Sequence, residues 1–215
     1  MDHNYPVYLN LAGRLCIVIG GGKVAERKVQ SLLACDANVK VISPTVSQFL
    51  LTAASLGKIQ LVLREYSCND IDNAFLVISA TANNQVNQQV ADDCLHQNKL
   101  VNVVDDPAKC NFIVPAVFRR GALSIAISTN GKSPTLARKI KKELMGHYGP
   151  EYAELLDLLG EMRGKVITGV QDMKRRRLIF EQMVNADLLD LLRKGEKEKV
   201  KERIEDVLGG SRVES

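Results

Sequence analysis

The chain has no tryptophan, and aromatic residues make up only 5% of its 215 residues. Its five cysteines and three histidines are scattered, without a Cys-x-x-Cys pair or a spacing typical of metal sites. We therefore expect reduced cysteines, a cytoplasmic location and no resident metal. No apolar run approaches the ~18 residues that span a bilayer, and the N-terminus does not resemble a signal peptide. No membrane association is predicted.

The net charge of +4 is too small to indicate nucleic-acid binding by itself. Basic residues nevertheless cluster at Arg119-Arg120, along 138–142 and along 174–177. Each run alone is best interpreted as a solvated face, but together they suggest a positively charged groove for a polyanion. Because aromatics are few and no nucleic-acid-binding motif is present, a small polycarboxylate suits the chain better than nucleic acid.

Three consecutive glycines follow a short apolar run at 15–19 and precede a helical pattern from about Lys23. Gly20, Gly22 and Ala25 fit the G-x-G-x-x-G/A fingerprint, in which a buried parallel strand turns into a helix whose N-terminus faces a phosphate. Gly20 would make the turn, Gly22 would let a pyrophosphate approach, and Ala25 would keep the helix close to the sheet. A glycine-rich turn without a ligand is the alternative, but the preceding strand favours a nucleotide.

Alternating strand and helix patterns continue to residue 111 and predict an α/β fold, a Rossmann-type doubly wound parallel sheet. The further strands are expected at 39–42, 59–63, 75–79 and 100–104, with helices at 45–56 and from about 84 to 97. The carboxyl ends of parallel strands meet at one rim. The Gly20 turn, Ser43-Pro44, Thr81 and Asp105 should therefore lie on that rim.

The pattern changes after residue 111, where 112–118 and 122–128 are typical of a hairpin with its turn at 119–121. Ser133 is a suitable N-cap and Pro134 a suitable first residue for a helix over 134–147. Further helices are expected at 151–162, 166–184, 186–193 and 197–208. These patterns predict a cofactor-binding domain at 1–111, a hairpin/helix dimerisation region at 112–148 and a small helical C-terminal domain at 149–215.

Two candidate-site positions need separate weighing. Where an acidic residue usually ends the second strand and binds the ribose, this chain has Ser43-Pro44. Ribose binding would then use backbone groups and the hydroxyls of Ser43 or Thr45, and the lack of a following arginine favours NAD+ over NADP+. Asp105 follows a buried strand, and partial burial there would suit it for acid–base chemistry. The alternative is a turn residue that caps Asp106-Pro107, and residue type alone does not decide between them.

Four motifs occur in order: GGGKVAERK at 20–28, VNVVD at 101–105, FIVP at 112–115 and GKSPTLAR at 131–138. Over residues 4–193 the chain resembles the precorrin-2 dehydrogenase/sirohydrochlorin ferrochelatase family, the N-terminal module of sirohaem synthase. No methyltransferase domain follows before Ser215, so the chain is similar to the stand-alone members. The resemblance implies an intertwined homodimer that exchanges its hairpin, with a tetrapyrrole substrate in a cleft beside the NAD domain.

The resemblance also implies roles for residues. Lys23-Val24 and Pro44-Thr45 match the family's NAD-contact positions, and Asp105 matches the catalytic aspartate. Thr129 stands where some members carry a phosphorylated serine, with Ser128 just before it. The expected cofactor-binding residues are Gly20, Gly21, Gly22, Lys23, Val24, Ser43, Pro44, Thr45 and Thr81. The expected substrate-binding residues are Arg119, Arg120, Ser128, Thr129, Lys132, Ser133 and Arg138.

The implied reaction is NAD+-dependent oxidation of precorrin-2 to sirohydrochlorin, with Asp105 accepting or relaying a proton. Insertion of Fe2+, as a substrate, is a second activity within the family. One alternative is a non-catalytic NAD-sensing module, but such regulators usually carry a winged-helix segment or an acidic residue after the second strand. The other is a Rossmann oxidoreductase for a small substrate, which leaves the basic C-terminal helices unexplained.

Overall fold

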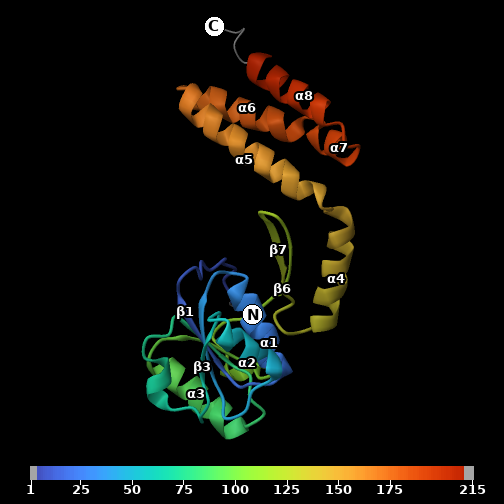
Figure 1. Cartoon of the computed structure of the whole chain (residues 1–215). Helices are drawn as coiled ribbons and strands as arrows, with labels where there is room; N and C mark the ends of the chain where they lie inside the picture. Colours follow the sequence, from blue (N-terminus) through green and yellow to red (C-terminus); the bar gives the residue numbers. More distant parts are fainter. Residues whose placement is uncertain (1–3, 211–215) are drawn as a thin grey trace. The chain divides into compact units, whose positions relative to one another are not determined.

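The computed structural model describes residues 4–210. The chain forms two compact units, Met1–Val114 and Pro115–Ser215 (Figure 1). The first unit is an α/β sandwich, and the second contains a β-hairpin followed by helices. The predicted fold class is therefore confirmed, while the division into three domains stays a prediction.

The first unit is built on one sheet of five parallel strands in the order β3-β2-β1-β4-β5. The strands are β1 (Leu15–Ile19), β2 (Asn38–Ile42), β3 (Gln60–Val62), β4 (Leu76–Ser79) and β5 (Leu100–Val103). The chain runs outward from β1 to β3 and then returns to place β4 on the other side of β1. This reversal creates a crevice at the carboxyl ends of β1 and β4, which is where open α/β sheets bind ligands.

Helices cover both faces of this sheet. The alternation of strand side chains sends Cys16 and Val18 toward α1 (Lys23–Leu33) and α2 (Gln48–Ser55), and Ile17 and Ile19 toward α3 (Asn84–His96). Two short 3-10 helices, η1 (Cys68–Ile71) and η2 (Pro107–Lys109), lie in the connections. Because β1 is buried on both faces, its carboxyl end and the glycine turn are rigidly held.

The second unit begins with an antiparallel hairpin of β6 (Ala116–Arg120) and β7 (Leu123–Ile127). Its helices are α4 (Pro134–His147), α5 (Glu151–Gly169), α6 (Met173–Asn185), α7 (Leu188–Arg193) and α8 (Lys197–Gly210). The hairpin turns at Gly121, whose φ of 54° favours glycine and where a Cβ would lie 2.8 Å from the Ala153 Cβ. A larger residue at this turn would force the hairpin away from α5.

Three predicted boundaries were wrong. The first hairpin strand begins at Ala116 rather than 112, after Pro115, which has no N–H to donate. Arg119 and Arg120 consequently pair with β7 as strand residues and not as turn residues. Helix α2 begins at Gln48 rather than 45, because Ser47 accepts the Leu50 N–H as its N-cap.

The break expected between 162 and 166 is also misplaced. Met162 and Val166 lie one turn apart on the same buried face, so α5 continues through this region to Gly169. Helix α6 starts only after Asp172, whose carboxylate accepts the N–H groups of Lys174 and Arg175.

Candidate functional site

Gly20 makes the turn at the end of β1, as predicted. Its φ is 116°, and its N–H donates to the Ile42 carbonyl at 2.9 Å. A Cβ added here would lie 2.7 Å from the Ala80 carbonyl carbon and 3.1 Å from the Thr81 nitrogen. Glycine is thus required on both conformational and steric grounds, and it lets the β1–α1 and β4–α3 connections touch.

Gly21 joins the turn to the loop after β2. A Cβ added at Gly21 would collide with the Thr45 carbonyl oxygen and lie 2.7 Å from the Val46 Cγ1, while the Gly21 carbonyl accepts the Ser47 N–H at 2.9 Å. This packing brings together the two segments that the family resemblance assigns to the cofactor. The sequence pattern gave no reason for the middle glycine, because the contact is with a residue distant in the chain.

Gly22 is the N-cap of α1 and provides no side-chain acceptor for the first-turn N–H groups. The helices α2 and α3 are instead capped by their own Ser47 and Asn83 side chains. A Cβ at Gly22 would meet nothing within 4 Å, so space remains in front of the helix. These features fit a bound pyrophosphate, which would accept the N–H groups and benefit from the helix dipole.

The residues after Gly22 form the first turn of α1, and Ala25 among them is the third position of the fingerprint. Lys23 is exposed and Val24 half-buried at the start of α1, and Ala25 is fully buried against the sheet. The small Ala25 side chain keeps α1 close to β1 and directs its N-terminus to the rim.

The loop after β2 is held by its own hydrogen bond. Ser43 is buried, and its Oγ donates to the Thr45 carbonyl at 2.7 Å. The Ser43 hydroxyl proton is therefore engaged within the loop, whereas Pro44 and Thr45 are exposed. Of the two hydroxyls considered for the ribose, that of Thr45 is the better placed to donate.

Thr81 follows β4 and is half-buried. Its Oγ1 accepts the Asn83 N–H at 3.2 Å, and its carbonyl accepts the Asn87 side-chain amide at 3.1 Å. The Asn87 Oδ1 in turn accepts the Ser79 hydroxyl at 2.7 Å, and both side chains are buried. Sequence reasoning missed Asn87, which lies inside a helix without a motif around it.

Asp105 lies just beyond β5 in a left-handed turn with φ 61° and is exposed, so the expected partial burial is not found. Its carboxylate interacts electrostatically with the ammonium of Lys28, a half-buried α1 residue that sequence reasoning missed. Burial and the nearby Arg27 lower the pKa of Lys28, and Asp105 opposes this by favouring the charged form. Asp106 has a structural role, since it pairs with Lys109 at 2.8 Å.

Several predicted substrate residues shape the second unit's loops. The Ser133 Oγ accepts the Leu136 N–H at 3.2 Å as the predicted N-cap of α4, and the Thr129 Oγ1 accepts the Ser133 N–H at 3.1 Å. The Ser128 Oγ accepts the Asn130 N–H at 3.0 Å. Arg120 donates from Nε to the Tyr148 carbonyl at 3.2 Å, so this guanidinium supports the hairpin–helix junction.

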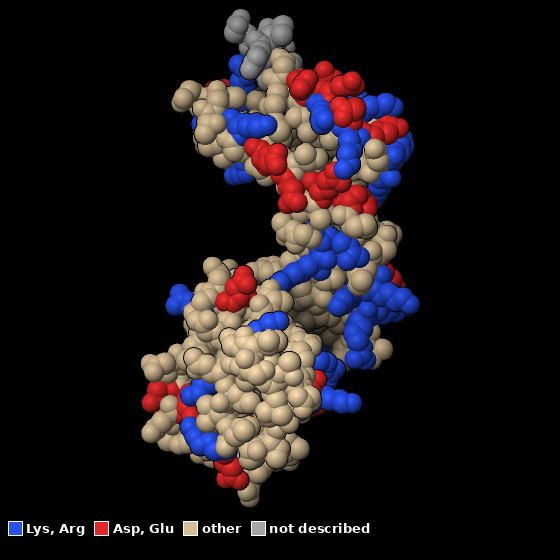
Figure 2. Space-filling model, in the orientation of Figure 1, with Lys and Arg blue, Asp and Glu red and all other residues tan. Residues whose placement is uncertain are grey.

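Helix α4 carries four cations within five residues, and Lys and Arg atoms along this part of the chain are blue in Figure 2. Arg138, Lys139 and Lys142 are exposed and Lys141 is half-buried. The remaining basic candidates, Arg119 and Lys132, are exposed in β6 and in the loop before α4. The second unit thus offers a basic surface suited to carboxylates.

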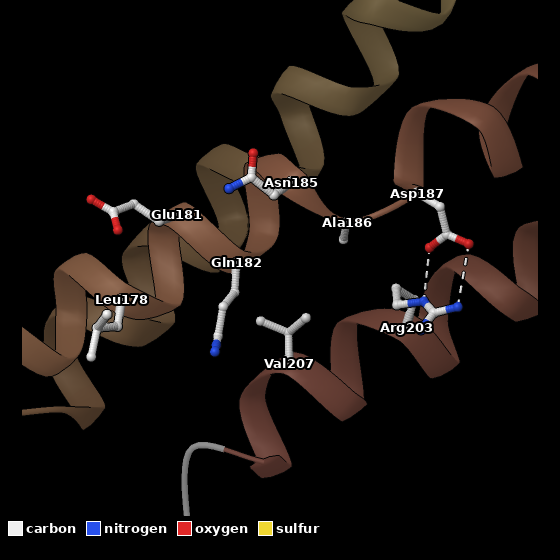
Figure 3. A pocket seen from close by; sticks show the side chains of 8 residues that line it. All are labelled: Leu178, Glu181, Gln182, Asn185, Ala186, Asp187, Arg203 and Val207. Carbon is white, nitrogen blue, oxygen red and sulfur yellow. Dashed lines mark hydrogen bonds and ion pairs between the residues drawn. The ribbon is translucent and has the colours of Figure 1, made fainter.

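A cavity of about 570 Å3 lies between α6, α8 and the connection from α6 to α7 (Figure 3). Its arginine, Arg203, is paired with Asp187 through contacts of 2.8 and 3.2 Å, and Glu181 also lines it. With its cation already paired, this cavity is poorly suited to an anionic ligand. It contains none of the predicted site residues.

Residues 4–210 contain no group of three or more His, Cys, Asp or Glu side chains placed to hold a metal ion. Within the same range, no helix has the length and apolar character needed to cross a membrane.

Three family models match the chain in sequence. Residues 7–116 match the family described as "Putative NAD(P)-binding", 120–147 the sirohaem biosynthesis protein central region, and 151–208 the sirohaem synthase dimerisation region. The structure is similar to that of "SirC, precorrin-2 dehydrogenase", with a TM-score of 0.82 and 28% identity. This similarity covers 96% of the present chain and 100% of the other.

Curated relatives are longer than this chain. Siroheme synthase of Actinobacillus succinogenes is 35% identical over 94% of the chain, and that of Photobacterium profundum is 33% identical over 95%. The chain spans 43% of the length of each of these two relatives. The uncapped α1, the glycine turn and the three successive matches agree: the chain belongs to the precorrin-2 dehydrogenase/sirohydrochlorin ferrochelatase family, with an NAD(P)-binding first unit.

Proposed function

We propose that this protein oxidises precorrin-2 to sirohydrochlorin with NAD+ in sirohaem biosynthesis. The observation that carries the proposal is the similarity to SirC, precorrin-2 dehydrogenase, over the whole of that chain. The rim of the first unit supports it, because Gly22 leaves the N-terminus of α1 open to a pyrophosphate.

Each part of the chain has a distinct task in this reaction. The first turn of α1 binds the pyrophosphate, and Thr45 and Thr81 orient the rest of the cofactor through their hydroxyls. When bound there, NAD+ would supply the two-electron oxidation as a hydride acceptor. Asp105, exposed at the same rim, takes up the proton that the macrocycle loses.

Lys28 complements Asp105. Its half-buried ammonium offsets the negative charge of the carboxylate in the free enzyme. When Asp105 takes up a proton, Lys28 remains as a fixed positive charge beside it.

The second unit binds the carboxylates of the tetrapyrrole. The exposed cations of α4 and the adjoining loop, notably Arg138 and Lys132, match the negative side chains of precorrin-2. The match of 151–208 to a dimerisation region supports a homodimer. We assign the protein to the cytoplasm, without a nucleic-acid or membrane partner.

To test this proposal, the purified protein is mixed with NAD+ and enzymatically generated precorrin-2, and NADH formation is measured by absorbance. Stoichiometric formation of NADH and sirohydrochlorin is expected. No NADH in the presence of substrate that a known dehydrogenase does oxidise would contradict the proposal, and would favour a non-catalytic NAD-sensing module if NAD+ still binds.

Insertion of Fe2+ into sirohydrochlorin stays a prediction from the family resemblance. A separate reaction without NAD+, containing sirohydrochlorin and Fe2+ or Co2+, tests it through the spectrum of the metallated product. Asp105→Asn in the same assay shows whether this carboxylate also removes pyrrole protons.

A further inference from the structure

A buried network of hydrogen bonds joins Ser79, Asn87 and Thr81 at the rim of the first unit, outside the glycine fingerprint. Ser79 at the end of β4 is 1% exposed and Asn87 in α3 is 6% exposed. Burying such groups is unfavourable unless they are hydrogen-bonded, and here each has a partner. The Ser79 hydroxyl donates to the Asn87 Oδ1 at 2.7 Å, and the Asn87 Nδ2 donates to the Thr81 carbonyl at 3.1 Å.

The orientation of the Asn87 amide follows from its partners. The Thr81 carbonyl can only accept, so the Nδ2 must face it, and the Oδ1 is left to accept the Ser79 hydroxyl. If Asn87 bonded only to Ser79, its role would be limited to holding α3 against β4. The second bond reaches the backbone of the β4–α3 loop, which is on the ligand rim.

Thr81 is fixed from two directions. The Asn87 Nδ2 donates to the Thr81 carbonyl, and the Asn83 N–H donates to the Thr81 Oγ1 at 3.2 Å. With the Oγ1 already accepting that N–H, the hydroxyl hydrogen is available to donate away from the loop. The same residue touches the cofactor turn, since a Cβ at Gly20 would lie 3.1 Å from the Thr81 nitrogen.

We infer that Asn87 is a positioning residue for dinucleotide binding: it locks the Thr81 backbone so that the Thr81 hydroxyl donates to the bound cofactor. The inference rests on the proposed function only in taking NAD+ as the ligand. It adds a residue that the fingerprint does not contain and that acts through another residue.

The test compares NAD+ affinities by calorimetry, in the absence of the tetrapyrrole. Asn87→Leu keeps the size of the side chain and adds no charge but removes the donor to Thr81, and should weaken NAD+ binding about tenfold, as expected for loss of one well-placed hydrogen bond. Thr81→Ala should cause a similar loss. If Asn87 acts through Thr81, the double variant should bind NAD+ about as weakly as either single variant.

Tyr66→Phe is the matched control. It removes a 2.9 Å side-chain bond from the Tyr66 hydroxyl to Asp93, which lies on the same helix α3 but near its other end. It should lower the melting temperature while leaving the NAD+ dissociation constant within about twofold of the parent, because Tyr66 does not contact Thr81. Asn87→Leu should differ from Tyr66→Phe, because it should raise the KM for NAD+ and leave kcat at saturating NAD+ little changed.

An unchanged NAD+ affinity in folded Asn87→Leu would overturn the inference. If that variant does not fold, Asn87→Ala replaces it. Thr81→Ala leaves the buried Ser79–Asn87 hydrogen bond in place. An unaltered NAD+ affinity in Thr81→Ala would therefore also overturn the inference. Additive losses in the double variant would assign the two residues independent roles. If the parent itself fails to bind NAD+, the proposed function falls instead.

Discussion

Helices α1 and α4 begin in opposite ways. Helix α1 starts at Gly22, which contributes no side-chain acceptor, whereas α4 starts at Ser133, whose hydroxyl accepts the Leu136 N–H, followed by Pro134, which has no N–H. Helix α4 satisfies its own N-terminus, whereas in the proposed function the N-terminus of α1 is satisfied by the bound cofactor. A ligand site can thus be recognised by the stabilising interaction that the protein omits.

The largest effect is expected at Asp105, whose carboxylate interacts electrostatically with Lys28 of α1. Asp105→Asn should lower turnover about 10²–10⁴-fold, the usual contribution of an acid–base group, while NAD+ binding persists. Asparagine is chosen because it tolerates the φ of 61° at this position. NADH formation with saturating precorrin-2 measures the effect.

Asp106→Asn is the control for Asp105. It removes the ion pair with Lys109 from the same turn and should change turnover by no more than about twofold, since this partly exposed pair stabilises only the turn itself. Equal losses in the two variants would indicate that the turn matters only for folding.

A carboxylate at the uncapped N-terminus of α1 should affect stability and NAD+ binding in opposite directions. Gly22→Asp places a good N-cap where a Cβ meets nothing within 4 Å, so the free energy of unfolding should stay the same or rise by a few tenths of a kcal/mol. NAD+ affinity should fall more than about 100-fold through steric exclusion and charge repulsion. Calorimetry and denaturant unfolding measure the two quantities.

Ser133→Asp provides the comparison at the other helix. It keeps an acceptor at the N-cap of α4 and should leave NAD+ affinity unaltered. Unaltered NAD+ affinity in Gly22→Asp would mean that the cofactor does not bind at α1.

The smallest effect is expected on stability, at the N-terminus of α4 that Ser133 caps. Ser133→Ala removes the N-cap of α4 and should lower stability by about 1 kcal/mol, seen as a reduced denaturation midpoint. Ser133→Thr, which retains the hydroxyl, should recover most of the loss. If alanine has no effect, solvent satisfies the α4 N-terminus and the contrast with α1 disappears.

The sequence predicted the features that depend on neighbours in the chain. The strand at 15–19, the start of α1 after Gly22 and the capping of α4 by Ser133 all follow from local pattern. Features set by contacts between distant segments were missed. Gly21 is required by the Thr45 carbonyl, and Asn87 matters because α3 passes beneath Thr81.

Two local predictions were wrong, each for a different physical reason. The segment around Gly164 has weak helical propensity, yet α5 continues because Met162 and Val166 both reach the core. Asp105 was expected to be partly buried because its strand is, but the chain turns outward immediately after β5. The reliability of a local pattern therefore falls at the ends of elements, where functional residues concentrate.

A cofactor bound at the open first turn of α1 would also stabilise the folded protein. A ligand that binds only the folded state adds stability that grows with its concentration, about 2.7 kcal/mol when it is present at 100 times its dissociation constant. Without the ligand, the first unit loses this contribution and opens more often. The amount of this protein that escapes proteolysis would then follow the supply of oxidised dinucleotide, which links its abundance to the redox state of the cell.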